Sequence, residues 1–206
     1  MKKIIVSLVV IAAVLTSCKE KQEKKIAENI EEKVETIVAA NNVDVETSVL
    51  VWKGFKPTGS HNGTVKLKSG NVVVENDILT SGEFVIDMTT ITDADGSKKL
   101  EGHLKSGDFF ETEIYPTSKF VITSVETKEG KLAVTGDLTI KNVTKSITIP
   151  ASISVEGVLI IFKSETFEVN RADFNVKYGS KSFFDNLKDK FINDMMELSF
   201  EVKASK

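Results

Sequence analysis

Histidine, the side chain most often used for acid–base chemistry and zinc binding near neutral pH, occurs only at His61 and His103. The sequence contains no His-x-x-x-His pair, no His-Glu-x-x-His motif and no cysteine cluster, so it predicts no dedicated metal site. It also lacks a Gly-x-Ser-x-Gly elbow and a phosphate-binding glycine loop. A site of two histidines and a carboxylate is the one metal arrangement left open. We therefore expect no catalytic residue, no resident metal and no cofactor.

Three polar residues need an interpretation, and two of them, His103 and Arg171, have two. His103 shares a predicted helical face with Leu100, where it either ties that segment to a neighbouring strand or contacts a bound ligand. Arg171 is the only arginine in the chain. A single arginine indicates a geometric requirement that lysine cannot meet, either a structural fork with Asp87 or Asp173 or a ligand contact. His61 falls in a glycine-bounded stretch that predicts an exposed turn.

The elements that must position these residues are predicted to be short strands. All twelve glycines and all three prolines follow residue 50, and apolar residues alternate with polar ones from there on. Such a pattern is typical of a sandwich or a barrel. Hairpin turns are expected at residues 69–71, 128–130 and 156–157, and a strand at 174–178. Helical inserts are expected at residues 97–107 and, from a capping-box pattern, at residues 182–185.

The aromatic residues are mostly phenylalanine, with twelve Phe against one Trp and two Tyr. Phenylalanine gives apolar surface without a group that needs a hydrogen bond, which suits either a solid core or a cavity for a hydrocarbon chain. An eight-stranded barrel is close to the size that side chains fill completely. Composition alone therefore favours a filled core.

The most distinctive stretch of the chain is Glu101-Gly-His-Leu-Lys-Ser-Gly-Asp-Phe-Phe-Glu-Thr-Glu-Ile-Tyr-Pro116. It resembles the signature of the YceI-like family of periplasmic lipid-binding proteins, in which aspartate usually stands at the position of Glu111. Further matches lie at Trp52-x-Gly54, at residues 59–65, 82–88, 136–144 and 149–151, and at Arg171-x-x-Phe-x-Val-x-Tyr-Gly179. Their joint order, over about residues 45–206, carries the resemblance.

The resemblance implies an all-β fold, an antiparallel lipocalin-like β-barrel of about eight strands with short helical inserts. It also implies an apolar interior that holds a long isoprenoid or fatty lipid, such as a polyprenol or quinone, and so reverses the preference for a filled core. The residues expected to contact the lipid are Phe84, Ile86, Met88, His103, Phe109, Phe110, Phe120, Ile122, Leu138, Ile140, Phe167, Arg171 and Phe174. Whether the protein carries the lipid or stores it stays open. The alternative is that the protein is an interaction or structural lipoprotein whose barrel is a filled scaffold.

The N-terminus has the features of a lipoprotein signal peptide. Residues 1–17 combine Lys2 and Lys3 with an apolar run from Ile4 to Leu15, which is too short for a bilayer that needs ~20 apolar residues. The run ends in Leu15-Thr-Ser-Cys18, a lipobox whose cysteine would be lipidated. Because Lys19 rather than Asp follows, we expect anchoring on the periplasmic side of the bacterial envelope, in the outer membrane.

The rest of the chain divides into a charged segment, residues 18–44, and the barrel domain, residues 45–206. The charged segment is expected to be a solvated tether, with a coiled-coil or partner-binding helix as the alternative. The chain has 27 basic and 30 acidic residues, a formal charge of −3, and no basic block. We therefore expect no nucleic-acid partner. The expected partners are the lipid ligand and the membrane, and homodimer formation stays open.

Replacing Cys18 with serine tests the anchor. The variant should incorporate no label after metabolic labelling with fatty acid, and it should leave the membrane fraction, because several acyl chains on one residue are needed for stable anchoring. Equal labelling of variant and wild type would rule out the lipobox interpretation.

Overall fold

The structure, a computed structural model, describes residues 40–128 and 130–206. The predicted signal peptide and lipidated Cys18, and almost all of the charged segment, lie outside these residues. Within them the chain is built mainly from antiparallel strands. In order these are β1 (Asn41–Asn42), β2 (Val49–Lys56), β3 (Gly59–Glu75), β4 (Ile78–Asp93), β5 (Thr117–Lys128), β6 (Lys131–Ile140), β7 (Val143–Glu156), β8 (Leu159–Ser164), β9 (Phe167–Asn170) and β10 (Met195–Ser205).

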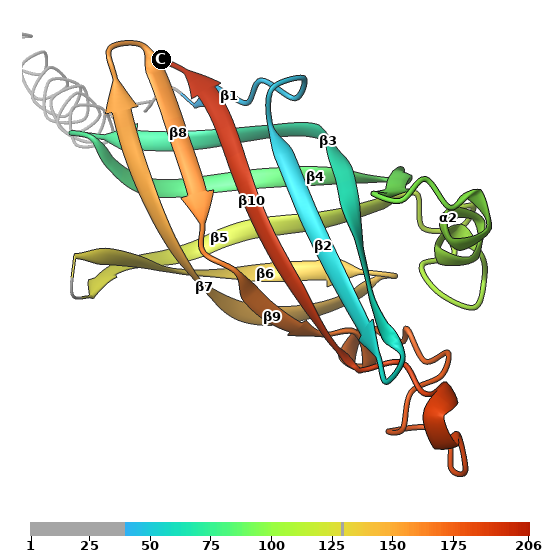
Figure 1. Ribbon diagram of the computed structural model, residues 1–206. Helices are drawn as coiled ribbons and strands as arrows, with labels where there is room; N and C mark the ends of the chain where they lie inside the picture. The colour runs from blue at the N-terminus through green and yellow to red at the C-terminus, as the bar shows by residue number, and fades with distance from the viewer. Residues whose placement is uncertain (1–39, 129) are drawn as a thin grey trace, which may run out of the picture. The chain divides into compact units, whose positions relative to one another are not determined.

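Eight of these strands close into a ring, in the order β3-β2-β10-β8-β7-β6-β5-β4 and back to β3 (Figure 1). The short strand β1 adds to β3, and β9 pairs with the first half of β10. Closure leaves no long sheet edge in the ring, which removes the usual template for aggregation. The expected antiparallel barrel of about eight strands is confirmed.

Alternation along the strands places apolar residues inside. In β4, for example, Phe84, Ile86 and Met88 are each less than 10 % exposed, while their neighbours are more accessible. Successive side chains of a strand point to opposite faces, so this period-two pattern gives each strand one core face. The helix α2 (Lys98–Lys105) interrupts the strands between β4 and β5, as expected, with Ser97 as its N-cap. No helix of the described residues has the length and apolar composition that crossing a bilayer requires.

The turn regions differ partly from expectation. The hairpins at residues 128–130 and 156–157 are confirmed by the pairing of Lys128 with Lys131 and of Glu156 with Leu159. No turn forms at residues 69–71, because β3 continues there through β-bulges that bend it around the barrel. The β3–β4 turn lies instead at Asn76 and Asp77, both with positive φ.

His61 also lies within β3 rather than in a turn. It pairs with Gly54 of β2, and the turn between these strands comes earlier, between Lys56 and Gly59. Of the two glycines that flank His61, Gly59 ends this turn and Gly63 lies within the strand. At Gly63 an added Cβ would overlap the carbonyl oxygen of Thr92 in β4, so this position needs glycine for the close approach of two strands.

The segment after β9 contradicts two further predictions. The predicted strand at residues 174–178 is replaced by the 3₁₀ helix η1 (Arg171–Phe174), which is capped by the side chain of Asn170 and ended by Asn175 with φ 60°. The predicted helix at residues 182–185 does not form, and the Ser182 hydroxyl donates a hydrogen bond to Asp194 instead of capping. A second short 3₁₀ helix, η2, covers Lys188–Lys190.

Gly63→Ala should destabilise the protein, because a Cβ there must displace strand backbone. We expect a loss of ~1–3 kcal/mol in the free energy of unfolding, measured by urea denaturation. Gly54→Ala is the matched control, because its Cβ would meet nothing within 4 Å. Equal losses in the two variants would contradict the close-approach explanation.

Candidate functional site

The barrel contains a cavity of about 320 Å³ at one end. Its wall is made mostly of aliphatic and aromatic side chains from β2, β3, β4, β5, β6, β7 and β10, together with α2 and the segments that follow α2 and β9. The polar side chains among its lining residues include Lys56, His61, His103, Ser118, Arg171 and Asn193. A concave, mostly apolar pocket with a few polar groups is the usual form of a small-molecule site.

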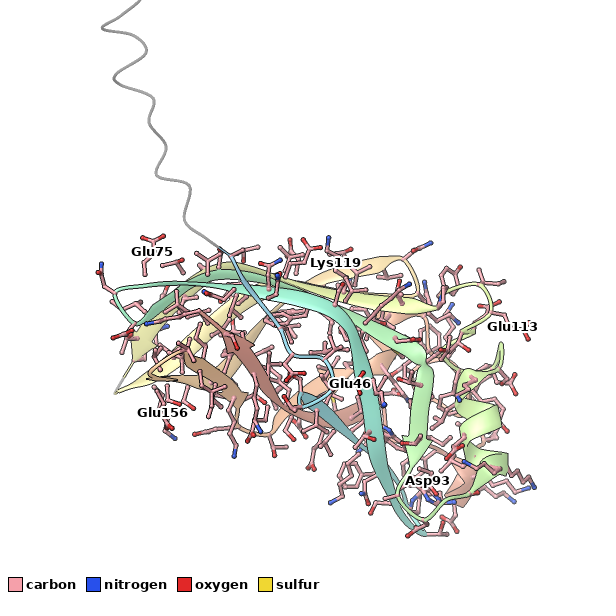
Figure 2. All side chains as sticks on the ribbon, turned by 90° about the horizontal axis from the view of Figure 1, so that it is seen from above. Glu46, Glu75, Asp93, Glu113, Lys119 and Glu156 are labelled. Carbon is pink, nitrogen blue, oxygen red and sulfur yellow. The ribbon has the colours of Figure 1, made fainter. Side chains whose placement is uncertain are left out.

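The other end of the barrel is filled with side chains. Its largest fully buried residues are Phe162, Leu79, Ile160, Val72 and Val134, and none of these five lines the cavity. They lie toward the β3–β4, β5–β6 and β7–β8 turns, the end where Glu75 and Glu156 are found in Figure 2. The barrel is therefore half solid and half hollow.

Phe162 forms the boundary between the two halves. Its ring stacks on Phe84 at 5.9 Å and packs against Phe200 at 4.9 Å between centroids, and both partners line the cavity. Because the side chains beyond this boundary leave a cavity of about 320 Å³, the filled core favoured by composition is wrong for this end.

Helix α2 lies at the end of the barrel marked by Asp93 and Glu113 in Figure 2, and its residues Leu100, His103 and Leu104 line the cavity, so we call this end the mouth. A buried polar network holds α2 there. Glu101 accepts hydrogen bonds from the Asp93 backbone N–H and from Lys98, and Asp93 accepts one from the Ser97 N–H at 3.0 Å. The Lys98 hydrogen bond, assisted by that of Asp93, lowers the pKa of the Glu101 carboxyl, so the ionised form is the one that anchors the helix.

The segment after α2 forms one side of the mouth. Phe109 and Phe110 both line the cavity, and backbone bonds such as Phe110 N–H to Leu104 carbonyl fold this segment back onto the helix. Lys141 in the β6–β7 turn donates to the Phe109 carbonyl and pairs with Glu111 at 3.3 Å. Glu111 thus has a defined structural partner.

His103 lies at the mouth, where its contacts are to the irregular segments after α2 and after η1 rather than to a neighbouring strand. Its Nε2 lies 3.2 Å from an Asp108 carboxylate oxygen, and its ring packs edge-on against Phe109 and Tyr178, with centroids 4.9 and 4.7 Å away. These contacts tie α2 to the segments beside it. His103 also lines the cavity, so it remains available to a ligand.

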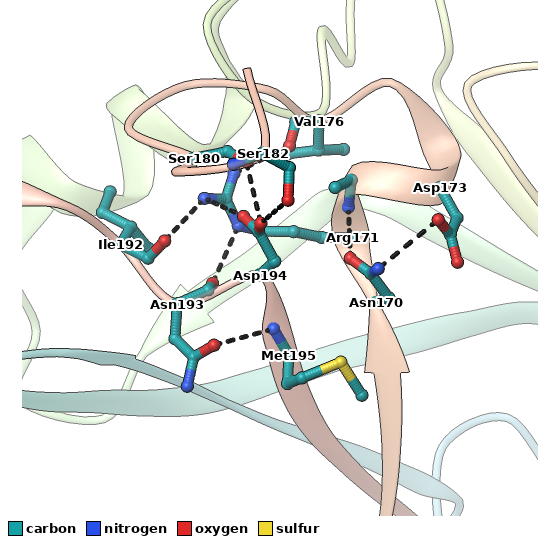
Figure 3. Close-up of polar contacts among 11 residues, drawn as sticks. Asn170, Arg171, Asp173, Val176, Ser180, Ser182, Ile192, Asn193, Asp194 and Met195 are labelled. Atoms are coloured by element: carbon teal, nitrogen blue, oxygen red, sulfur yellow. Dashed lines mark hydrogen bonds and ion pairs between the residues drawn. The ribbon is translucent and has the colours of Figure 1, made fainter. Parts of the chain in front are cut away.

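Arg171 is the centre of a buried network behind the mouth (Figure 3). Its guanidinium donates to the backbone carbonyls of Val176, Ile192 and Asn193, and pairs with Asp194 at 3.3 Å. Burial lowers the pKa of Arg171, and the charge of Asp194 opposes this shift. Arginine stays charged in proteins, so its planar fork acts as a permanent donor set.

The structural fork expected for Arg171 is present, but its partner is Asp194 and not Asp87 or Asp173. Asp87 accepts instead from Thr89, and Asp173 from the side chain of Asn170. The carboxylate of Asp194 also accepts hydrogen bonds from the Ser180 and Ser182 hydroxyls at 2.8 and 2.6 Å. The network therefore fixes the irregular chain between β9 and β10.

Eleven of the thirteen residues predicted to contact a ligand line the cavity. The two exceptions are Ile122 and Phe174. Ile122 is buried in β5, but it does not line the cavity. Phe174 is buried in η1, where the strand alternation used to place it no longer applies. Whether the eleven bind lipid stays a prediction.

Sequence reasoning did not select several wall residues. They include Leu50, Trp52, Phe55, Ile147, Ile149, Ile192, Met196, Leu198 and Phe200. Most follow the same period-two alternation, which would have found Leu50 and Trp52 in β2. Ile192 lies in irregular chain, where no periodic signal exists. The rim also brings His61, Asp93 and Asp95 together, a grouping that the sequence did not predict.

Comparison with known proteins agrees with this architecture. The pattern of the YceI-like domain matches residues 39–204, which is most of the chain. The protein belongs to the YceI-like family.

A UPF0312 protein of Pseudomonas putida is 35% identical over 97 residues, which are 47% of this chain and 50% of that protein. Protein YceI of Escherichia coli O157:H7 is 39% identical over 69 residues, 34% of this chain and 36% of its own. The matched region thus spans about half the length of these curated relatives, or less.

Solved structures share the fold. BcnA of Burkholderia cenocepacia superposes with a TM-score of 0.66 at 23% identity, covering 79% of this chain and 99% of BcnA. A polyisoprenoid-binding domain from Saccharophagus degradans gives a TM-score of 0.62 at 15% identity, covering 81% and 98%. At these identities the likeness shows the YceI-like barrel and nothing more.

Arg171→Lys should be strongly destabilising although it keeps the charge. A lysine cannot serve three carbonyls and Asp194 together, and each buried carbonyl left without a donor costs ~1–3 kcal/mol. Chemical denaturation of the variant measures this loss. Lys163→Ala is the control, since the Lys163–Glu201 pair is exposed and worth ~1 kcal/mol or less. A wild-type stability for Arg171→Lys would overturn the role of the network.

Proposed function

We propose that this protein binds a long-chain isoprenoid or fatty lipid in the apolar cavity of its barrel. The main observation that supports this proposal is the cavity itself, an apolar space of about 320 Å³ in a barrel of a size that side chains can fill. A structural relative described as a polyisoprenoid-binding domain supports the choice of ligand class. The proposal assigns a binding role and no catalysis.

The position of the polar groups supports a ligand with one oxygen-bearing end. His103 and Arg171 lie at the mouth and Ser118 lies in the wall, opposite Ile86 in the sheet. The Ser118 hydroxyl is buried and has no hydrogen-bond partner among the described residues. A buried hydroxyl left unpaired costs ~1–3 kcal/mol, which an oxygen atom on the ligand would relieve. A quinone or polyprenol meets that requirement better than a pure hydrocarbon.

The proposal places the protein in the cell envelope. We infer that Cys18 carries the lipid anchor and holds the barrel on the periplasmic side of the outer membrane. The basis is the lipobox Leu15-Thr-Ser-Cys18 and the lysine that follows it. An anchored barrel would then take up lipid close to the bilayer that supplies it, either to carry it or to store it.

Mass spectrometry of lipid extracted from the purified full chain with Cys18→Ser tests the ligand class. The expected result is one isoprenoid or fatty lipid, near one molecule per chain. A protein that is purified empty, and that fails to take up a quinone, a polyprenol or a fatty acid, would favour the scaffold function instead.

A pair of isoleucine substitutions tests the cavity. Ile86→Phe places a larger ring in the cavity wall, so lipid uptake should fall by tenfold or more while the melting temperature changes little. Ile122→Phe is the matched control, because Ile122 is buried outside the cavity wall. There overpacking should cost ~1–3 kcal/mol, with lipid affinity kept. The opposite pattern would show that the lipid lies elsewhere.

A further inference from the structure

His61, Asp93 and Asp95 converge at the rim of the barrel from three consecutive parts of the fold. His61 lies near the start of β3, Asp93 ends β4, and Asp95 lies in the turn that leads to α2. One nitrogen or oxygen atom from each residue falls within a group whose members all lie within 4.8 Å of one another. Imidazole and carboxylate together form the donor set of many divalent metal sites.

Two buried atoms in this group lack a hydrogen bond. They are Nδ1 of His61 and Oδ1 of Asp93, and no partner for either exists in the part of the chain that the structure describes. They face each other at 3.7 Å, which is too long for a hydrogen bond, and the Asp93 side chain is only 1% exposed. Unpaired buried polar atoms are few in native proteins, and each one calls for an explanation.

The Asp93 carboxylate is held in this position by its surroundings. Its other oxygen, Oδ2, accepts a hydrogen bond from the Ser97 N–H at 3.0 Å, and its backbone N–H is bound to Glu101. Asp93 therefore cannot turn toward His61 without giving up the contact to Ser97 at the N-cap of α2. The free oxygen is directed at the imidazole by bonds made elsewhere, as expected for a preorganised ligand.

We propose that His61, Asp93 and Asp95 bind a divalent transition-metal cation, of the zinc or manganese type, at the rim of the cavity. Two ligands at ~2.1 Å from one tetrahedral ion lie roughly 3.4 Å apart, close to the spacing of the two unpaired atoms. Asp95 is exposed, so it supplies the third ligand from the solvent side and leaves a position for water. The imidazole disfavours calcium, which takes oxygen ligands almost alone.

Such an ion would join β3, β4 and the entrance to α2 at one point. His61 also lines the cavity, so the cation would lie beside the lipid site and stiffen its mouth. The proposal goes beyond lipid binding and does not depend on it, because the metal ligands can be tested in protein that has been stripped of lipid.

The test uses the full chain with Cys18→Ser, treated with a chelator and dialysed, so that the only thiol is gone. Isothermal titration with ZnCl2 and with MnCl2 should show one ion per chain. The two histidines give separate imidazole signals in the proton NMR spectrum, and Zn²⁺ should shift those of His61 alone. His61→Ala and Asp95→Asn should each lower the affinity at least about tenfold. His103→Ala is the matched control and should bind the ion as the parent does, because Asp108 is the one carboxylate paired with His103 among the described residues.

Asp95→Asn is the decisive variant, since Asp95 is exposed and should fold normally, whereas Asp93→Asn also disturbs Ser97. If the ion still binds to both His61→Ala and Asp95→Asn, then it binds adventitiously at another place and the proposed site is wrong. The proposal is also wrong if the protein binds neither ion and His61→Ala only lowers the melting temperature. His61 and Asp93 would then form a simple structural contact.

Discussion

A closed ring of eight strands sets the interior volume of this protein, and the rest of the structure depends on how that volume is used. Eight strands enclose a space that side chains can just fill. Here the two ends use it differently, because Phe162 lies at the boundary, Leu79 and Ile160 fill the space beyond it, and the side chains on the other side leave a cavity. The hollow remainder is stable only because the filled half and the closed hydrogen-bonded ring hold the walls apart.

The polar groups near the cavity are mostly satisfied by the protein itself. Arg171 binds three backbone carbonyls and Asp194, and Glu101 binds Lys98 and the backbone of Asp93. Charged groups can lie beside an apolar cavity only when paired in this way, because an isolated charge there is expensive. The networks hold the irregular segments of the mouth, and they leave few donors and acceptors free for a ligand. Ser118 and His61 are exceptions, and each of them has an unpaired buried atom.

The mouth is also where the fold departs from regular alternation. Helix α2, the segment after it and the chain between β9 and β10 carry His103, Phe109, Phe110 and Ile192 to the cavity. These parts follow no strand pattern and are fixed by side-chain-to-backbone bonds. Loops on a rigid scaffold commonly carry function, and here the same loops set the width of the opening.

The sequence by itself determined the class of the fold and part of the wall. Period-two alternation in residues such as Phe84, Ile86 and Leu138 predicts their inward direction, because the side-chain direction along a strand depends only on parity. The family motifs added the barrel and its hollow interior, which composition alone had rejected. Local signals also placed α2, where Ser97 caps the first turn.

Only the tertiary structure decided the long-range contacts. The partner of Arg171 is Asp194, far along the chain, because folding brings the end of β9 beside the start of β10. Residues 182–185 have a local capping pattern, yet Ser182 binds the half-buried carboxylate of Asp194 instead, because a short helix with a weak signal is unfavourable to nucleate. Ile122 obeys the strand pattern and still misses the cavity. Parity tells which face a residue occupies, and only packing tells which part of that face is hollow.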